Sequence, residues 1–487
     1  MDAKFRPGKF GMKRFEVMER KDADAVHLKS LQLLERMGIK VVSEEGRRLL
    51  KAAGAEVDEK THVCKIPGHL VEESMRKCMR PVKMAARNPA YDFVLDGEHC
   101  YACTDGVGLA TIDLETGERR PSTLKDVADS ARIVDSLPMM HMYNPLVTPL
   151  DVPKHAHTVH EYLAALENCE KHFTTGSTYQ KEEAVYEIKM ASAVVGGEEE
   201  LRKRPIISNL TCTTSPMVLG MTTDAAIEFS RAGCPPLLMA MPLIGATAPM
   251  TVAGAVVLGN AQVIALATVL QLAAPGSPLC YSSEPMAMDV QSGLFEGLFP
   301  AADMVRAAHV QMAKRYGIPI FIGGWGTCSK APDVQAGYEK AFSAFIAYLS
   351  GADMTSGPGL LENWTVLSFE QLLIDHEMFT MMADMLKGFP VDDLSVPMDV
   401  IMEVGHEGHY MGKKHTLDHF REMWQPVVTD GRTYKEWKAS GSKSAVDHAR
   451  DRAKEILKTH VPGPLSEDIR KELRAIVSEA EGGIPHK

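Results

Sequence analysis

Short apolar runs alternate with longer amphipathic segments through the middle of the chain. Eight such runs occur, each closed by a small or polar cluster, at residues 99–106, 139–145, 172–178, 205–212, 236–242, 278–285, 319–326 and 352–359. The segments between them have the period of helices. Strands that alternate with helices pair in parallel, and runs this continuous are typical of strands buried on both faces. The pattern predicts an α/β fold, a closed (β/α)8 TIM barrel, with an open doubly wound sheet as the alternative.

Both ends of the chain have helical periodicity instead. Residues 28–41, 43–57 and 68–79 each carry apolar positions at helical spacing, and a helical pattern returns after the eighth run. We therefore expect an N-terminal helical cap over residues 1–95, the barrel over 96–365, and a C-terminal helical extension packed on the barrel over 366–487.

The amino-acid composition and the absent motifs argue against several classes of binding protein. The chain has 487 residues, of which 45% are hydrophobic, so it can bury a large core. The formal net charge is -11, and no basic patch with interleaved aromatic residues occurs, so neither nucleic acid nor an anionic membrane is an expected partner. The G-x-G-x-x-G and P-loop motifs are also absent, which argues against a nucleotide-binding open sheet.

Three features of the sequence indicate the cellular compartment in which the protein is expected. The apolar stretch 252–274 is interrupted by Asn260, Gln262 and Gln271, which predicts a buried helix rather than a membrane span. The N-terminal segment carries charges throughout and lacks the apolar core of a secretory signal. Nine scattered cysteines suit reduced thiols better than a disulfide framework. We expect a cytoplasmic protein.

The residues that close the eight runs are the candidate site, because barrel enzymes carry their sites at the carboxyl ends of the strands. They show no Ser/His/Asp order, no close carboxylate pair at obvious spacing and no lysine within a strand, so acyl transfer, glycoside cleavage and Schiff-base chemistry are not indicated. What they offer is aromatic faces and amide groups: Tyr143, Asn144, Asn209, Tyr281 and Trp325, with Trp364 in the loop after the last strand.

Aromatic faces of this kind bind quaternary ammonium ions, which have no N–H to donate. Glu284, which also closes a run, would balance the charge of such a cation. The alternative is that Tyr143 and Tyr281 fill the barrel and that Trp325 packs beneath a loop.

Histidine and cysteine clusters raise the question of a metal. Cys100 and Cys103 are closely spaced but lie in a predicted strand, and His406 and His409 open a histidine-rich block that lacks the H-E-x-x-H zinc spacing. We therefore expect no bound metal, and we expect the histidines to be structural or to contact the substrate, with a metal site as the alternative. Lys330 either caps its helix or faces a partner protein.

Three segments of this sequence resemble the trimethylamine:corrinoid methyltransferase family: LKSLQLLERMGIKV (28–41), GGWGTCSKAPDVQAGYEK (323–340) and HYMGKKHTLDHFREMWQPVVTDGRTYKEW (409–437). The likeness extends over about residues 25 to 460. It implies a (β/α)8 barrel that moves a methyl group from a methylated amine to the Co(I) of a separate corrinoid protein. The expected cofactor is thus a corrinoid (cobalamin) carried by that partner, and a symmetric homo-oligomer and a role in methylamine metabolism are implied as well.

One departure from the family changes the expected substrate. The founding members use pyrrolysine, an electrophile that captures trimethylamine, in the region of the seventh strand, whereas this chain reads Trp325-Gly326-Thr327-Cys328-Ser329-Lys330 there. A quaternary amine already carries the charge that makes its nitrogen a leaving group, and members without pyrrolysine act on such amines. The resemblance therefore implies demethylation of a small quaternary amine, with glycine betaine first and proline betaine or carnitine as alternatives.

In this interpretation the carboxylate of a betaine would be bound by N–H or O–H donors, and the candidates are Asn144, Asn209, Ser177, Thr211, His406 and His409. Two other functions remain open at this point. One is a zinc-dependent methyltransferase for a thiol or alcohol with the same fold, and the other is a non-catalytic betaine-binding protein.

Overall fold

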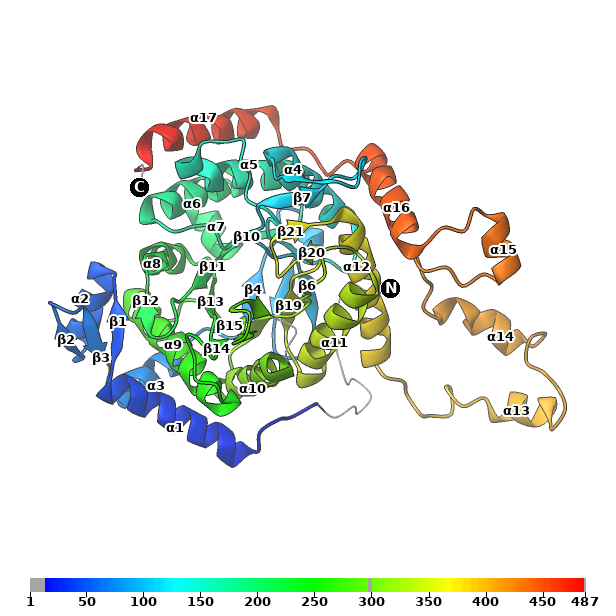
Figure 1. Cartoon of the computed structure of the whole chain (residues 1–487), viewed down its shortest axis with the longest axis horizontal. Helices are drawn as coiled ribbons and strands as arrows, with labels where there is room; N and C mark the ends of the chain where they lie inside the picture. Colours follow the sequence, from blue (N-terminus) through cyan, green and yellow to red (C-terminus); the bar gives the residue numbers. More distant parts are fainter. Residues whose placement is uncertain (1–13, 297–299, 486–487) are drawn as a thin grey trace.

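The computed structural model describes residues 14–296 and 300–485, and its centre is a closed barrel of eight parallel strands (Figure 1). Each strand lies inside one of the eight predicted runs, so the predicted (β/α)8 barrel is confirmed. In chain order they are β6 (Tyr101–Cys103), β9 (Met142–Tyr143), β10 (His172–Thr175), β11 (Ile207–Cys212), β13 (Pro236–Ala240), β15 (Cys280–Ser283), β18 (Ile320–Gly323) and β19 (Met354–Ser356).

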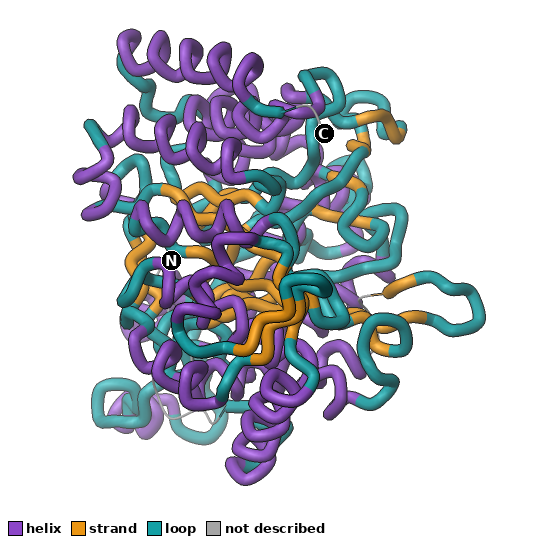
Figure 2. The backbone as a smooth tube through the Cα atoms, turned by 90° about the vertical axis from the view of Figure 1, so that its left-hand side faces the viewer, coloured by secondary structure: helices purple, strands orange, loops and turns teal. Residues whose placement is uncertain are grey.

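A helix follows each strand and covers the outside of the barrel, and Figure 2 shows the strands in the interior with helices around them. These helices are α4 (Leu124–Ser136), α5 (His157–Asn168), α6 (Lys181–Val195), α8 (Thr222–Ala232), α9 (Val252–Ala273), α10 (Pro300–Tyr316), α11 (Val334–Ser350) and α12 (Phe369–Leu386). In the described part of the chain, α9 is the one helix long and apolar enough to cross a membrane, but it is mostly buried. It packs against α1 (Arg20–Arg36), α3 (Gly68–Lys77) and β13, as a barrel helix does.

The N-terminal region is less helical than its sequence pattern predicts. Besides α1, α2 (Glu44–Ala52) and α3, it contains three short strands, β1 (Ile39–Val41), β2 (Glu56–Asp58) and β3 (Val63–Lys65), which form a sheet with β12 (Val218–Leu219). A separate hairpin, β4 (Val82–Met84) and β5 (Phe93–Leu95), packs its apolar side chains against those of the barrel interior. Strands of three residues are too short to show a clear period of two, so helical patterns around them dominate the sequence signal.

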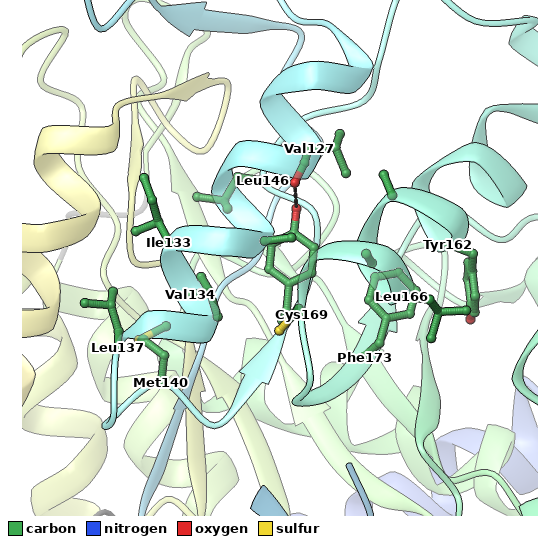
Figure 3. Packing of buried hydrophobic residues seen from close by; sticks show 14 of the residues in the cluster. Val127, Ile133, Val134, Leu137, Met140, Leu146, Tyr162, Leu166, Cys169 and Phe173 are labelled. Carbon is green, nitrogen blue, oxygen red and sulfur yellow. Dashed lines mark hydrogen bonds between the residues drawn. The ribbon is translucent and has the colours of Figure 1, made fainter. Parts of the chain in front are cut away.

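The alternation of side chains along each strand divides the barrel residues into two sets. One set faces the lumen and forms a cluster with the β4–β5 hairpin: Tyr101, Cys103, Met142, Leu210, Leu237, Met239, Cys280, Phe321 and Met354. The other set faces the helices. Figure 3 shows part of that outer layer, where Tyr162 and Leu166 of α5 lie beside Phe173 of β10.

The C-terminal region divides into packed helices and an arm. The helices α16 (Ala445–Thr459) and α17 (Glu467–Gly483) pack on α12, α4, α5 and α6. Residues 387–443 form the arm, which projects from the body in Figure 1 and contains α13 (Met398–Val404), α14 (Lys414–His419), a short 3-10 turn and α15 (Tyr434–Ala439). None of the residues in these elements is buried.

The arm is tied to α12 at one place. The backbone N–H groups of Val427, Val428 and Thr429 donate to the carboxylate of Glu377, and the indole N–H of Trp424 donates to the Thr380 hydroxyl at 2.9 Å. The extension is therefore packed on the barrel at its two ends, whereas most of the arm is not.

Trp325, directly after β18, is a fully buried side chain. Its Nε1 donates to Thr355 Oγ1 at 2.9 Å, and its ring belongs to the same cluster as Ala344 and Tyr348 of α11. Its backbone lies in the left-handed region, with φ of +57°, and its carbonyl accepts from Lys340 Nζ at 2.8 Å. Trp325 thus packs between the barrel wall and α11.

We expect Trp325→Ala to lower the free energy of unfolding by about 3–5 kcal/mol, because truncation of a buried aromatic residue leaves a cavity. Trp325→Phe keeps most of the apolar volume and is expected to lose less. Urea unfolding and the melting temperature of both variants measure the effect. An unchanged melting temperature in Trp325→Ala, together with loss of ligand binding, would instead assign this tryptophan to the substrate site.

Candidate functional site

Four polar side chains and one glycine, from five neighbouring strands, lie at the carboxyl-terminal end of the barrel lumen. We call this end of the lumen the mouth. Their positions continue the lumen-facing set of each strand. We call them the acidic half-ring, and in barrel order from β9 to β15 they are Asn144, Asp105, Ser356, Gly323 and Glu284.

Asp105 is held from both sides by hydrogen bonds. Asn144 Nδ2 donates to Asp105 Oδ1 at 3.1 Å, and Ser356 Oγ donates to Asp105 Oδ2 at 2.9 Å. Asn144 and Ser356 are buried, whereas Asp105 is partly exposed. The carboxylate of Asp105 is therefore fixed in orientation but accessible from the mouth.

Glu284 lies over Gly323. A Cβ built on Gly323 would lie 1.0 Å from Glu284 Oε2, so any larger residue at position 323 would displace this carboxylate. Glu284 Oε1 accepts from Arg306 Nη2 at 2.6 Å, and Arg306 Nη1 donates to Asp303 at 2.6 Å. Glu284 Oε2 is buried and has no hydrogen-bond partner among the described residues. The ion pair thus holds Glu284 by one oxygen and leaves the other, which is buried, without a partner.

Both carboxyl groups of the half-ring have raised pKa values. Burial raises the pKa of Asp105 to about 6, although the hydrogen bond from Ser356 opposes the shift. Burial likewise raises the pKa of Glu284 to about 7 against the attraction of Arg306, and the charge of Asp105 adds to the increase. A cation in the mouth favours the ionised forms, so its binding and the ionisation of these groups are linked.

The remainder of the mouth is apolar. Cys212 and Met241 continue the lumen-facing sets of β11 and β13, and both are partly exposed. Trp364 is half-buried beside Gly357, where a Cβ would lie 3.1 Å from the Trp364 indole nitrogen. The mouth therefore has one anionic side and one apolar side with polarisable sulfur and aromatic groups.

Trp364 is held by a strained turn between β20 (Leu360–Leu361) and β21 (Val366–Leu367). Glu362, Asn363 and Trp364 all have positive φ, at +49°, +53° and +65°. The backbone N–H of Asn363 donates to the Thr327 carbonyl at 2.8 Å, which ties this turn to the loop after β18. Consecutive non-glycine residues in the left-handed region are costly and are found where surrounding structure enforces them, commonly at functional sites.

The structure contradicts the expectation that Tyr143 and Tyr281 line the mouth. The Tyr143 hydroxyl donates to the Val127 carbonyl of α4 at 2.8 Å, the bond drawn as a dashed line in Figure 3. The Tyr281 hydroxyl donates to Asn260 of α9 at 3.2 Å. Both are fully buried between the barrel and its helices. Successive strand residues face opposite sides, so Asn144, one position after Tyr143, and Glu284, three positions after Tyr281, face the lumen while the two tyrosines do not.

Asn209 and Trp325 are also not at the mouth. Asn209 precedes Leu210, which faces the lumen, and it is buried with its Oδ1 accepting from the Thr211 hydroxyl. Trp325 contacts Thr355 and the α11 layer, as described above. Of the predicted residues, the structure brings Asn144 and Glu284 to the mouth and Trp364 to its edge, and their roles in binding remain predictions.

His406 and His409 are exposed residues of the arm, beyond α13, in the part that projects from the body in Figure 1. They lie away from the half-ring, so the expected contact of these histidines with a substrate in the mouth of the same chain is not what the structure shows. Lys330 is exposed, and its Nζ donates to the Cys328 carbonyl at 2.7 Å within the same loop. Among the described residues, no group of three or more His, Cys, Asp or Glu side chains is arranged to hold a metal ion.

Asp105 and Arg306 are the residues that sequence reasoning missed. Asp105 follows the first barrel strand in the segment Thr104-Asp105-Gly106. An acidic residue at the end of a strand, with no basic residue beside it in the sequence, could have identified it as a site residue. Arg306 had no such signal, because it lies within α10 and reaches the mouth only through Glu284.

Comparison with known proteins identifies the family. Residues 3–485 match the family described as trimethylamine methyltransferase (MTTB). The trimethylamine methyltransferase MttB of Desulfitobacterium hafniense is 34% identical over 462 residues, which cover 94% of this chain and 92% of that protein. MttB1 of Methanosarcina acetivorans is 31% identical, over 94% of this chain and 93% of its own. A glycine betaine methyltransferase of Desulfitobacterium hafniense is 27% identical, over 96% of this chain and 97% of its own.

Solved structures agree on the fold. The monomethylamine methyltransferase MtmB of Methanosarcina barkeri superposes with a TM-score of 0.56 at 10% identity, over 94% of this chain and 91% of that one. The resemblance inferred from the three sequence segments is confirmed, as is the prediction that the protein is a methyltransferase. Because the family match spans nearly the whole chain, this protein belongs to the trimethylamine methyltransferase (MTTB) family.

Proposed function

We propose that the protein demethylates a small quaternary amine and passes the methyl group to the Co(I) of a corrinoid protein. The observation that carries this proposal is the acidic half-ring, with Asp105 and Glu284 at the mouth of a barrel of this methyltransferase family. The similarity to a glycine betaine methyltransferase supports a quaternary amine as substrate. So does the segment from Trp325 to Lys330, which contains no electrophilic side chain.

The half-ring suits a cation that cannot donate hydrogen bonds. A quaternary ammonium ion is attracted by charge and by polarisable surfaces rather than by hydrogen-bond acceptors of fixed direction. Asp105 and Glu284 supply the negative charge, and Met241 and Trp364 supply apolar surface for the methyl groups. The polar and apolar sides together orient the nitrogen within the mouth.

The transfer itself needs no proton donor or acceptor. The C–N bond breaks with its electron pair left on nitrogen, which departs as a neutral tertiary amine, while the methyl carbon takes the electron pair of Co(I). The residues of this chain then have two tasks, to hold the nitrogen and to direct one methyl group out of the mouth. Alignment of this kind accounts for up to about 7–11 kcal/mol of barrier reduction in well-oriented reactions.

Moderate rather than tight binding of the cation favours the reaction. The nitrogen loses its positive charge in the transition state, so a site that binds the cation too strongly stabilises the ground state and slows the step. Glu284 shares its charge with Arg306, which weakens its hold on a substrate cation. The buried ion pair with Arg306 therefore reduces the negative electrostatic potential at the mouth while it keeps Glu284 in place.

Incubation of the protein with Co(I) cobalamin and a panel of quaternary amines, glycine betaine, proline betaine and carnitine included, is expected to yield methylcobalamin with at least one of them and none with trimethylamine. Neutral trimethylamine has no activated leaving group, and the chain offers no electrophile to supply one. Absorbance of methylcobalamin measures the reaction. Robust turnover of trimethylamine would contradict the proposal, and binding of a quaternary amine without any transfer would favour a binding protein.

Chelator-treated protein is expected to keep its methyl-transfer activity, because a quaternary amine needs no metal to activate it as a leaving group. The test compares protein dialysed against a zinc chelator with the same protein after zinc is restored, with total zinc measured in both. A stoichiometric zinc ion whose removal abolishes transfer would instead favour the zinc-dependent thiol or alcohol methyltransferase.

A further inference from the structure

We propose that the mouth selects quaternary amines that carry no carboxylate, such as choline, over betaines. This inference rests on the proposed function and concerns the substrate class of the same site. Two observations carry it: the balance of charges around the acidic half-ring, and the kind of hydrogen-bonding atom left without a partner there.

Carboxylates outnumber cations at the mouth. Asp105, Glu284 and Asp303 form one connected acidic group, and Arg306 is the cation within it. Arg306 is fully buried behind Glu284, with Nη2 donating to Glu284 and to the Pro285 carbonyl. A substrate in the mouth therefore meets Asp105 and Glu284 and not the guanidinium behind them.

Other cations of the described chain near the strand ends are engaged elsewhere. Lys340 is fully buried behind the barrel wall, with its Nζ 3.0 Å from Asp375 and 2.8 Å from the Trp325 carbonyl oxygen. Lys330 is exposed in the loop after β18 and donates to the carbonyl of Cys328. The described residues thus place no cationic side chain where it would contact a substrate carboxylate inside the half-ring.

The unpaired atoms at the mouth are acceptors on its acidic side. Glu284 Oε2 and Asn144 Oδ1 are both buried and lack a hydrogen-bond partner in the described structure. A hydroxyl group of a substrate can donate to either of them, whereas a carboxylate presents only further acceptors. The Trp364 indole N–H is an unpaired donor nearby, but one neutral N–H does not offset two carboxylates.

Choline and glycine betaine are a matched pair for this test. Both contain a trimethylammonium group on a CH₂, and they differ in a hydroxymethyl group against a carboxylate. In glycine betaine the carboxylate lies two bonds from the cationic nitrogen, so it enters the mouth with it and faces Asp105 and Glu284. Like charges at such distances repel strongly where water is partly excluded.

We expect choline to bind at least about tenfold more tightly than glycine betaine at pH 7.5, and to give the higher kcat/KM for methylcobalamin formation. Calorimetric titration measures binding independently of activity. Equal or tighter binding of glycine betaine, or absence of choline binding, would overturn the inference. A clear preference for choline with no transfer from any quaternary amine would instead reject the proposed enzymatic function and leave the charge selection standing.

The pH dependence of the wild-type protein is a second measurement. Asn144, Ser356 and Glu284 face Asp105, and Arg306 and Asp303 stand behind Glu284. The thiols of Cys103 and Cys212 also lie near Asp105, but burial raises their pKa values, so they stay protonated in the pH range of the test. A cation binds best when the carboxyl groups are ionised, so choline affinity is expected to rise from pH 5 to about pH 8, one unit above the higher of the two pKa values, and then level off. Affinity that is unchanged over this range would also contradict the inference.

Asp105→Asn removes one charge at nearly constant shape and is expected to reduce the preference for choline over glycine betaine by about tenfold. It is also expected to remove the part of the pH dependence near pH 6. Asp393→Asn, an equal change of charge at an exposed position of the arm, is the matched control and is expected to leave both unchanged. An undiminished preference in folded Asp105→Asn would overturn the assignment of this residue.

Discussion

The candidate site depends on one buried ion pair. Arg306 is fully buried, so its charge requires anionic partners, and Glu284 and Asp303 provide them at 2.6 Å each. Loss of one partner of such a pair commonly costs about 3–5 kcal/mol, because a buried charge is left uncompensated. This requirement holds Glu284 over Gly323 with one oxygen bound and the other free. The position of a negative charge in the mouth is thus set by the stability of the fold.

The negative charge at the mouth affects both the binding of a cation and its reaction. Asp105 is oriented by Asn144 and Ser356, and it is separated from Glu284 around the half-ring by Ser356 of β19 and Gly323 of β18. Their raised pKa values reflect the cost of burying negative charge there, a cost that Arg306 offsets only in part at Glu284. A site that is strained electrostatically when empty gains from binding a cation and releases it as the nitrogen becomes neutral.

The strained backbone near the seventh and eighth strands surrounds the same mouth. Trp325 and the run from Glu362 to Trp364 have positive φ without being glycine, and the two segments are joined through the Thr327 and Ser329 carbonyls. The segment from Trp325 to Lys330 is therefore held by backbone hydrogen bonds from the adjoining turn. Trp325 packs against α11, while Trp364 lies in the adjoining turn beside Gly357, which follows β19.

By itself, the sequence determined the eight barrel strands, the order of strands and helices, and the family, because buried parallel strands produce continuous apolar runs and the family segments are long and specific. It also predicted that the site residues lie where those runs end, and this stays a prediction. Only the tertiary structure decided which of the residues at each strand end faces the lumen. A shift of one residue reverses the face, so Asn144 and Glu284 point inward while Tyr143 and Tyr281 point toward α4 and α9. The ion pair between α10 and the end of β15 and the projection of the arm depend on contacts between distant segments, which no local pattern encodes.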